Sequence, residues 1–412
     1  MHEHTASSTR LIVVPAGGLA AVGSGYATYL TYAEYLNELA ELVGGLRIYA
    51  PIYQPDNAEY EYFSQRALDP VLCEVVPLAG HSRNQGGATL LGNYMQQAGA
   101  FRRDARSWRR VLIYSPSVTA GLAARALKRQ STATCAVYTY VWGDWAELAP
   151  HLPQTGIVRR ALNPWQQRWI LAQERWLVSR SRTAWVAGPR LRERYEPVCK
   201  NVKETIPMIR MTELLAASPS REGRDPHRLL YVGRLAPGKG LEFLLETLSL
   251  LAPEQPDIRL RLVGNGDSAF VDQLRRGATD LGVHERVDLV GVLQNGPALW
   301  DEYRRAGMFV LPSLSEGFPR VLYEAMALGT PIVTTSVGSI PALLQAGRDA
   351  IIVKPGTVPD LLAGIRTVWD SEDGGASLAH AARRLFEQRM AGGESSKAQR
   401  VAEVIIGDDR AN

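Results

Sequence analysis

Two acidic residues, Glu316 and Glu324, stand on either side of a predicted loop-to-helix junction, with seven residues between them. The apolar run 308–312, MFVLP, has the length of a buried parallel strand, and a polar loop, 313–318, follows it. Pro319 suits the first position of a helix. The free N–H groups at such a helix start can hold a phosphate, and helical side chains tilt back toward that end. A phosphate between two hydroxyl-binding carboxylates is the chemistry of a sugar nucleotide.

A second loop carries two cations, Arg234 and Lys239, within the sequence GRLAPGKG. It follows a strand-like run, and a helix is expected from about Leu241. Arg can bind a diphosphate as a bidentate fork and Lys as a point charge, while Gly238 and Gly240 allow close approach of the backbone. An Arg and a Lys on a loop are also common at solvated surfaces. The glycine spacing and the acid pair downstream favour a diphosphate site.

Apolar runs alternate with helical patterns in both halves of the chain, which predicts an α/β protein with doubly wound parallel sheets. The polar segment 212–228 is expected to be a linker plus the approach to a second domain. In such sheets, ligands bind outside the carboxyl ends of the strands. In the first half, the strand ends that matter are therefore Gly17–Gly18, Ser115–Ser117 and Trp142–Asp144.

The first predicted strand, 11–15, is followed by a glycine-rich stretch at 17–25 that we expect to lead into a helix. A glycine-rich turn that opens a helix lets the backbone approach a phosphate. The stretch lacks the G-x-G-x-x-G fingerprint of dinucleotide-binding domains. The alternative is a plain loop that needs positive φ angles.

The composition indicates a globular protein of two domains. The chain has 412 residues, of which 46% are hydrophobic and 21% charged. Three widely spaced cysteines suggest neither a disulfide framework nor a zinc site. We expect a cytoplasmic protein, because the start of the chain lacks the pattern of a signal peptide and no apolar run is long enough to span a membrane. A net charge of +4 does not indicate nucleic-acid binding.

Two segments of the first half, 101–110 and 157–182, are rich in arginine. In the second, Trp165, Trp169 and Trp176 form a helical stripe with Ala172. A basic amphipathic helix with tryptophans can lie on an anionic membrane, so peripheral contact at the inner face of the membrane is one interpretation. The other is a solvated charged face above an ordinary core stripe.

The motifs GRLAPGKG and SEGFPRVLYEAMALGTPIVTTSVGSIPALL resemble those of the retaining glycosyltransferases of family four, which have the GT-B fold. The likeness is specific over 228–357 and looser over 11–200. It implies two Rossmann-like domains that face a cleft. We expect an acceptor-binding domain at 1–205, a donor-binding domain at 206–385 and a helix at 386–412 that crosses back to the first domain.

The resemblance implies that Arg234 and Lys239 neutralise the diphosphate of a nucleotide-sugar donor. Glu316 would hold the hydroxyls of the transferred sugar, and Glu324 those of the ribose. The other donor-binding residues implied by the family are Gly18, Gly233, Val292, Gly317, Phe318, Pro319, Val321 and Leu322.

The chain departs from the family at two positions. Many members carry a His after the fifth strand of the first domain, where this chain has Trp142, Gly143 and Asp144. Either Asp144 takes over a hydroxyl-binding role, or the acceptor differs. Ala342 replaces a Glu that often follows the paired acids.

The family transfers a sugar with retention at the anomeric carbon, and the departing phosphate takes the acceptor proton. We expect no cofactor and no metal, and the sequence contains no Asp-x-Asp motif. The donor would be UDP- or GDP-linked, and the acceptor a carbohydrate, a lipid-linked glycan or a small molecule. The alternatives are a nucleotide-sugar-binding pseudoenzyme of the same fold and a dinucleotide-dependent oxidoreductase.

Overall fold

The computed structural model describes residues 10–55, 60–80, 87–129, 135–144, 157–205, 214, 223–317, 319–390 and 396–410. The described residues form two compact units. Unit 1 contains those up to 205 together with 396–410, and unit 2 contains 214 and 223–390. The change of unit therefore follows residue 390, whereas the sequence suggested 386. Within the described part of the chain, no helix is long and apolar enough to cross a membrane.

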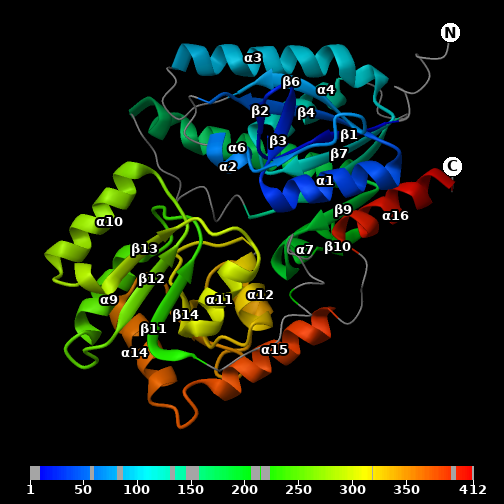
Figure 1. The fold of residues 1–412 in the computed structure, drawn as a ribbon. Coiled ribbons are helices and arrows are strands. Elements are labelled where there is room, and N and C mark those ends of the chain that lie inside the picture. The colour runs from blue at the N-terminus through cyan, green and yellow to red at the C-terminus, as the bar shows by residue number, and fades with distance from the viewer. Residues whose placement is uncertain are drawn as a thin grey trace. The chain divides into compact units, whose positions relative to one another are not determined.

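Unit 1 is built on one largely parallel sheet (Figure 1). Its strands run in the order β10-β9-β8-β7-β1-β4-β2-β3-β5, and β6 pairs with β4 outside this order. The strands are β1 (Leu11–Val14), β2 (Leu19–Val22), β3 (Gly25–Thr28), β4 (Leu46–Tyr53), β5 (Arg66–Ala67), β6 (Cys73–Ala79), β7 (Arg110–Ser115), β8 (Ala136–Val141), β9 (Thr183–Val186) and β10 (Val202–Glu204).

Helices cover both faces of this sheet. One apolar core lies beneath α1 and α16, and a second lies on the side of α3, α4 and α6. The helices of unit 1 are α1 (Leu30–Val43), α2 (Tyr60–Phe63), α3 (Gly87–Asp104), η2 (Ala105–Ser107), α4 (Val118–Lys128), α6 (Ile157–Arg180), α7 (Pro189–Tyr195) and α16 (Lys397–Arg410). Figure 1 shows α16, in red, alongside α1, in blue, so the end of the chain completes the core of unit 1.

Unit 2 contains a parallel sheet in the order β13-β12-β11-β14-β15-β16. The strands are β11 (Asp225–Val232), β12 (Arg259–Val263), β13 (Val287–Gly291), β14 (Ala306–Leu311), β15 (Ile332–Thr335) and β16 (Ile351–Val353). The helices are α9 (Leu241–Leu251), α10 (Ser268–Asp280), η5 (His284–Arg286), α11 (Pro297–Arg305), α12 (Arg320–Ala327), α13 (Ile340–Leu343), α14 (Val358–Trp369) and α15 (Ala376–Met390). The predicted fold class, two α/β domains with parallel sheets, is confirmed.

Two sequence-based expectations about local structure were wrong, and a third, the linker, extends into a strand. The glycine-rich stretch after β1 does not open a helix directly, because the hairpin β2–β3 comes first and turns at Gly23, whose φ is +57°. The segment 212–228, expected to be a linker plus the approach to a second domain, ends inside β11, which includes residues 225–228. Pro319 caps α12 rather than starting it, since its ψ of 107° is extended.

The tryptophan stripe of α6 packs in part, but it is not the most buried side of that helix. Its fully buried positions are Ile170, Glu174, Leu177 and Val178, which repeat with helical spacing on a different side. Trp165 is exposed, and Trp176 lies under the ammonium group of Lys128 at 4.9 Å. Trp176 also packs against the core beside α3 and α4, and the Trp169 ring lies 2.5 Å from where a Cβ at Gly121 of α4 would be. Among the tryptophans, the expected core stripe is therefore wrong for Trp165 only.

Candidate functional site

The two loops singled out in the sequence lie side by side because β11 and β14 are neighbouring parallel strands. Both loops leave the carboxyl edge of the sheet, and the Leu314 N–H donates to the Gly238 carbonyl at 2.9 Å. Gly240 has a φ of +70°, and a Cβ at this position would lie 2.0 Å from the Pro312 carbonyl oxygen. A side chain at Gly240 would therefore separate the loops.

Lys239 and Glu316 form an ion pair at the centre of this edge. The Lys239 Nζ donates to Glu316 Oε1 at 2.7 Å, and the Ser313 hydroxyl donates to the same oxygen at 2.6 Å. Glu316 is 9% exposed. The pair thus joins the predicted phosphate-binding cation to the predicted sugar-binding acid, although 77 positions separate them in sequence.

Arg234 differs from Lys239. Its side chain is exposed, and no ion pair to it is found among the described residues. Its carbonyl accepts a hydrogen bond of 2.9 Å from the Tyr231 hydroxyl, which fixes the backbone of the loop. Burial, and secondly the nearby charge of Glu316, raises the pKa of Tyr231 well above its ordinary value. The loop therefore presents Arg234 as an unpaired cation, and the uncharged Tyr231 hydroxyl fixes the backbone that carries it.

Glu324 is buried inside α12, with 1% of its surface exposed. The Tyr303 hydroxyl donates to its Oε2 at 2.9 Å, and Arg320 Nε lies 3.5 Å from its Oε1. Oε1 accepts no hydrogen bond from the described residues. Burial raises the pKa of the carboxyl group, and the charge of Arg320 opposes that shift. Glu324 therefore retains capacity to accept a hydrogen bond from a ligand.

The start of α12 is held by the next strand end. A Cβ at Gly338, whose φ is +55°, would lie 1.8 Å from the Glu316 carbonyl oxygen. The Ser339 N–H donates to the Gly317 carbonyl at 3.3 Å. Leu322 donates its own amide to the Pro319 carbonyl at 3.2 Å, so this predicted phosphate ligand is already engaged.

The remaining predicted donor-binding residues divide into three groups. Phe318 lies outside the described residues. Gly233 follows β11, and its carbonyl would lie 1.9 Å from a Cβ at Gly264, so these strand ends pack backbone to backbone. Val292 follows β13 and is exposed, and Val321 lies in the first turn of α12.

Gly18 lies between β1 and β2 of unit 1 and has a packing reason to be glycine. A Cβ there would lie 2.5 Å from the Tyr53 ring and 2.6 Å from the Pro51 carbonyl oxygen. The absence of a side chain at Gly18 is therefore required within unit 1, whether or not a phosphate binds nearby.

The position where the family carries a His is occupied differently here. Asp144 is buried, and its two carboxylate oxygens accept hydrogen bonds from Arg194 at 2.7 and 2.5 Å. Trp142 is 41% exposed, and its indole N–H donates to the Pro116 carbonyl at 3.3 Å. Asp144 thus holds Arg194, while Trp142 presents an oriented ring at the end of β8.

The sequence missed the partners that complete these groups. Ser313 and Tyr303 bind the two acids of unit 2, and Arg194 and Glu174 organise the strand ends of unit 1. Ser313 is the first residue of the predicted polar loop, 313–318, and could have been suspected. The other three lie in helices far away in sequence, and no local signal marks them.

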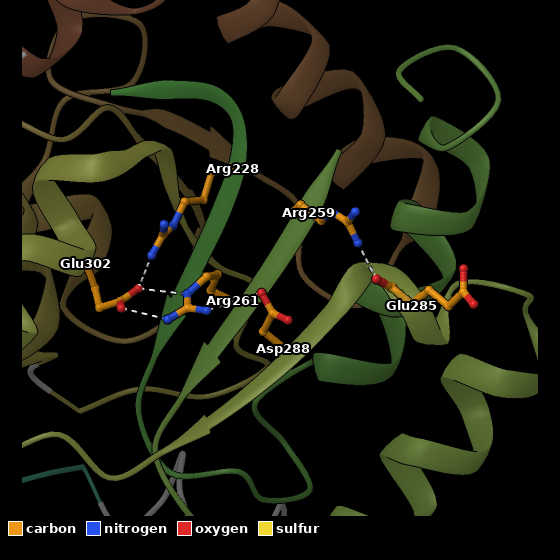
Figure 2. A network of polar contacts seen from close by, with 6 residues as sticks. All are labelled: Arg228, Arg259, Arg261, Glu285, Asp288 and Glu302. Atoms are coloured by element: carbon orange, nitrogen blue, oxygen red, sulfur yellow. Dashed lines mark hydrogen bonds and ion pairs between the residues drawn. The ribbon is translucent and has the colours of Figure 1, made fainter. Parts of the chain in front are cut away.

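A second charged cluster in unit 2 is structural (Figure 2). Arg261 binds Glu302 through Nε at 2.9 Å and Nη2 at 2.7 Å, and Arg228 donates to the same carboxylate. Burial alone would raise the pKa of Glu302, but the hydrogen bonds from the two arginines outweigh it and lower the pKa. The cluster also includes Asp288, 3.2 Å from Arg261, and its charges satisfy one another across β11, β12, β13 and α11.

The sequence of unit 2 matches known proteins. Residues 226–371 match the family model described as "Glycosyl transferases group 1". A mannosylfructose-phosphate synthase of Agrobacterium fabrum is 34% identical over 176 residues, which are 40% of this chain and 38% of that protein. A D-inositol 3-phosphate glycosyltransferase of Thermobispora bispora is 32% identical over 188 residues, 44% of this chain and 43% of that protein. The matched part thus spans less than half the length of these relatives.

The fold of the whole chain also has known counterparts. The sucrose-phosphate synthase of Thermosynechococcus elongatus aligns with a TM-score of 0.68 and 17% identity, covering 98% of this chain and 100% of that one. Anabaena HepE in complex with UDP aligns with a TM-score of 0.62 and 18% identity, over 98% of this chain and 100% of the other. The chain therefore has the GT-B fold, and residues 226–371 form a domain of the glycosyl transferases group 1 type.

Proposed function

We propose that this protein is a retaining glycosyltransferase of family four that transfers a sugar from a nucleoside diphosphate sugar. One observation carries the proposal. The Lys239–Glu316 pair, at 2.7 Å, shares a sheet edge with α12, inside which Glu324 keeps a carboxylate oxygen without a hydrogen bond. A cation, a helix start and two acids on neighbouring loops suit a phosphate flanked by hydroxyls. The structures of Anabaena HepE with UDP and with UDP-glucose support this donor class.

The roles follow from the state of each group. The unpaired Arg234 takes a phosphate oxygen directly, whereas Lys239 is held by Glu316 and reaches a phosphate from that position. Glu316 accepts hydrogen bonds from the sugar hydroxyls, beside the backbone of Gly317, Phe318 and Pro319. Glu324 accepts from the ribose. The Val321 amide and Gly233 approach the phosphates, and Val292 lies against the base.

The reaction needs positioning and charge stabilisation rather than a protein base. The bond from the anomeric carbon to the diphosphate oxygen breaks, and the acceptor oxygen forms its bond to that carbon on the same face. The acceptor proton passes to the departing phosphate. Arg234, Lys239 and the start of α12 stabilise the charge that develops on the leaving group, and we propose that no metal or cofactor takes part.

We propose a hydroxyl-rich acceptor bound through unit 1: a carbohydrate, a lipid-linked glycan or a small molecule. The names of the relatives, which include mannosylfructose-phosphate synthase and D-inositol 3-phosphate glycosyltransferase, refer to small polyhydroxylated compounds and support the first and last of these. Synthesis of cell-surface polysaccharide is the process that a glycan acceptor would imply.

Peripheral contact with an anionic membrane has one observation in its favour. The exposed side of α3 carries Leu91 and Met95, which are 61% and 67% accessible, and Arg102 and Arg103 near its end, and Arg106 is exposed in the adjoining η2. Apolar and basic groups on one helix face suit an interface between anionic headgroups and acyl chains. Sedimentation with anionic liposomes tests this, and binding that is absent or insensitive to salt would reject it.

The test of the main proposal is a thermal-shift panel with UDP, GDP, ADP and NAD, followed by hydrolysis of the matching nucleotide sugar. We expect one nucleoside diphosphate to stabilise the protein. Lys239→Ala should weaken its binding by about tenfold, as removal of one charge-assisted contact predicts. Lys354→Ala, which removes an exposed lysine from the same unit, is the control.

The outcomes separate the alternatives. Stabilisation by NAD alone would reject the transferase in favour of an oxidoreductase. Nucleotide binding without turnover of any donor would favour a pseudoenzyme, in which the Asp144–Arg194 pair replaces the His of active relatives. Equal affinity of Lys239→Ala and Lys354→Ala would show that the assigned loop does not bind the diphosphate.

A further inference from the structure

Glu174, the only acid of the arginine-rich segment 157–182, is buried in unit 1, and both of its carboxylate oxygens accept a hydrogen bond. The Ser115 hydroxyl donates to Oε2 at 2.7 Å. The Tyr195 hydroxyl donates to Oε1. Ser115 ends β7 and Tyr195 ends α7, so one side chain of α6 joins two segments near the carboxyl edge of the sheet.

The first of these contacts leads to Trp142. The carbonyl of Ser115 accepts the backbone N–H of Trp142 at 2.9 Å, and the carbonyl of Pro116 accepts its indole N–H at 3.3 Å. Glu174 therefore fixes the side chain of Ser115, and the carbonyl of Ser115 binds the backbone of Trp142. The indole cannot turn without losing its hydrogen bond, yet its ring remains partly exposed.

The second contact leads to Asp144. Tyr195 follows Arg194, whose guanidinium binds Asp144 in a bidentate manner at 2.7 and 2.5 Å. Asp144 lies two residues after Trp142, directly beyond β8. The two contacts of Glu174 thus converge on the same strand end, one through the indole and one through the ion pair.

We propose that Glu174 is a positioning residue for an acceptor subsite at the end of β8, where the indole of Trp142 stacks on a pyranose ring. The inference rests on the proposed glycosyltransferase function. An indole offers a flat apolar face of fixed orientation, which fits the C–H face of a sugar ring. The adjacent Asp144–Arg194 pair supplies planar polar groups for the ring hydroxyls.

The protonation state of Glu174 decides whether both contacts are made as observed. The ionised carboxylate accepts from both hydroxyls, whereas a protonated one must donate from one oxygen, so either Ser115 or Tyr195 has to turn its hydroxyl. The pKa of Glu174 is raised to about 7, because burial, with a smaller contribution from Asp144, outweighs the lowering by the hydrogen bonds from Tyr195 and Ser115 and by the charge of Arg194. Acceptor binding should therefore weaken as the pH falls through about 7.

The experiment measures binding of methyl pyranosides (methyl glucoside, mannoside and galactoside) to the full chain by saturation-transfer NMR at pH 6 and pH 8. Nucleoside diphosphate affinity is recorded on the same samples. For the wild type, we expect one pyranoside to bind about fivefold more tightly at pH 8, as the loss of one hydrogen bond predicts. Trp142→Ala should abolish that binding. Glu174→Gln, an amide with one acceptor oxygen, should show the weaker affinity at both pH values.

The control is Gln173→Ala, which changes the adjacent residue of α6 and should retain wild-type affinity and pH dependence. A wild-type protein that binds nucleotide but no pyranoside would overturn the inference and leave the proposed function standing. So would pyranoside binding that survives Trp142→Ala, or a Glu174→Gln variant with unchanged pH dependence. A protein that binds no nucleotide would contradict the proposed function instead.

Discussion

Two buried glutamates, Glu174 in unit 1 and Glu324 in unit 2, occupy comparable places and are prepared for different tasks. Each lies on a helix near the carboxyl edge of a parallel sheet, and burial raises the pKa of each. Both oxygens of Glu174 accept a hydroxyl, whereas one oxygen of Glu324 accepts no hydrogen bond among the described residues. A saturated carboxylate positions its neighbours, and an unsaturated one is ready for a ligand.

The surroundings of Glu174 and of the acids in unit 2 are also held in place in different ways. Near Glu174, side chains are fixed by other side chains, as in the Asp144–Arg194 pair. Near Glu316 and Glu324, the loops are fixed by backbone packing, and glycines such as Gly240 and Gly338 allow that packing. Unit 2 therefore keeps Arg234 and one oxygen of Glu324 available, because its backbone maintains the shape of the site.

The largest effect is expected from Glu316→Ala. Transfer should fall about a thousandfold, because the variant removes the predicted sugar-binding carboxylate and leaves Lys239 without its partner. Steady-state rates with the preferred donor would measure this, and circular dichroism would check the fold. Glu246→Ala, an exposed acid on α9, is the matched control and should retain full activity.

Gly240→Ala tests whether backbone packing maintains the site of unit 2. The positive φ and the 2.0 Å approach to the Pro312 carbonyl predict a loss of about 3 kcal/mol in the free energy of unfolding. Chemical denaturation would measure it. In contrast, Gly99→Ala in α3 of unit 1 meets open space and should stabilise by about 0.5–1 kcal/mol. Equal effects at the two positions would contradict the proposed contrast.

Glu174→Gln should stabilise the protein at high pH. The pKa of Glu174 is raised from 4.5 to about 7, so ionisation destabilises the folded state increasingly between those values. A shift of this size corresponds to about 3 kcal/mol, fully present above pH 7 and fading toward pH 5. Thermal unfolding across that range measures the difference between variant and wild type. A gain that did not change with pH would argue against a titrating Glu174.

Glu324→Gln tests the difference between Glu174 and Glu324 directly, with the smallest expected effect. Like Glu174→Gln, this variant should not lower the free energy of unfolding, because burial disfavours the charged form of Glu324. Unlike Glu174→Gln, it should weaken nucleoside diphosphate affinity about tenfold by removing a charged acceptor. Isothermal titration calorimetry would compare the two variants. A nucleotide affinity that falls equally in both would remove the distinction between a positioning and a ligand-binding acid.

Much of unit 2 could be predicted from the sequence, because its signals are local. The strand ends, the glycines and the spacing of Glu316 and Glu324 lie within short segments, and the neighbouring positions of β11 and β14 in the sheet bring the two loops together. The helix start was misplaced by one residue at Pro319, since a proline fixes φ but not ψ.

Unit 1 was predicted less well for the opposite reason. The hairpin β2–β3 replaced an expected turn, and its outer partners are distant in sequence, since β2 pairs with β4 and β3 with β5. Two tryptophans of α6, Trp169 and Trp176, pack against its neighbours, but the fully buried residues of the helix lie on another side. Amphipathicity shows that a helix has an apolar side, but not which residues the neighbouring elements cover.

The sequence by itself determined the fold class and the chemical character of the donor loops, because periodicity, glycine and charge act over a few residues. Only the tertiary structure decided which charges are already paired. It joined Lys239 to Glu316, bound both oxygens of Asp144 to Arg194, and buried Glu174 between Ser115 and Tyr195. Those pairings link residues as many as 77 positions apart, and only the packing of strands and helices brings them within hydrogen-bonding distance.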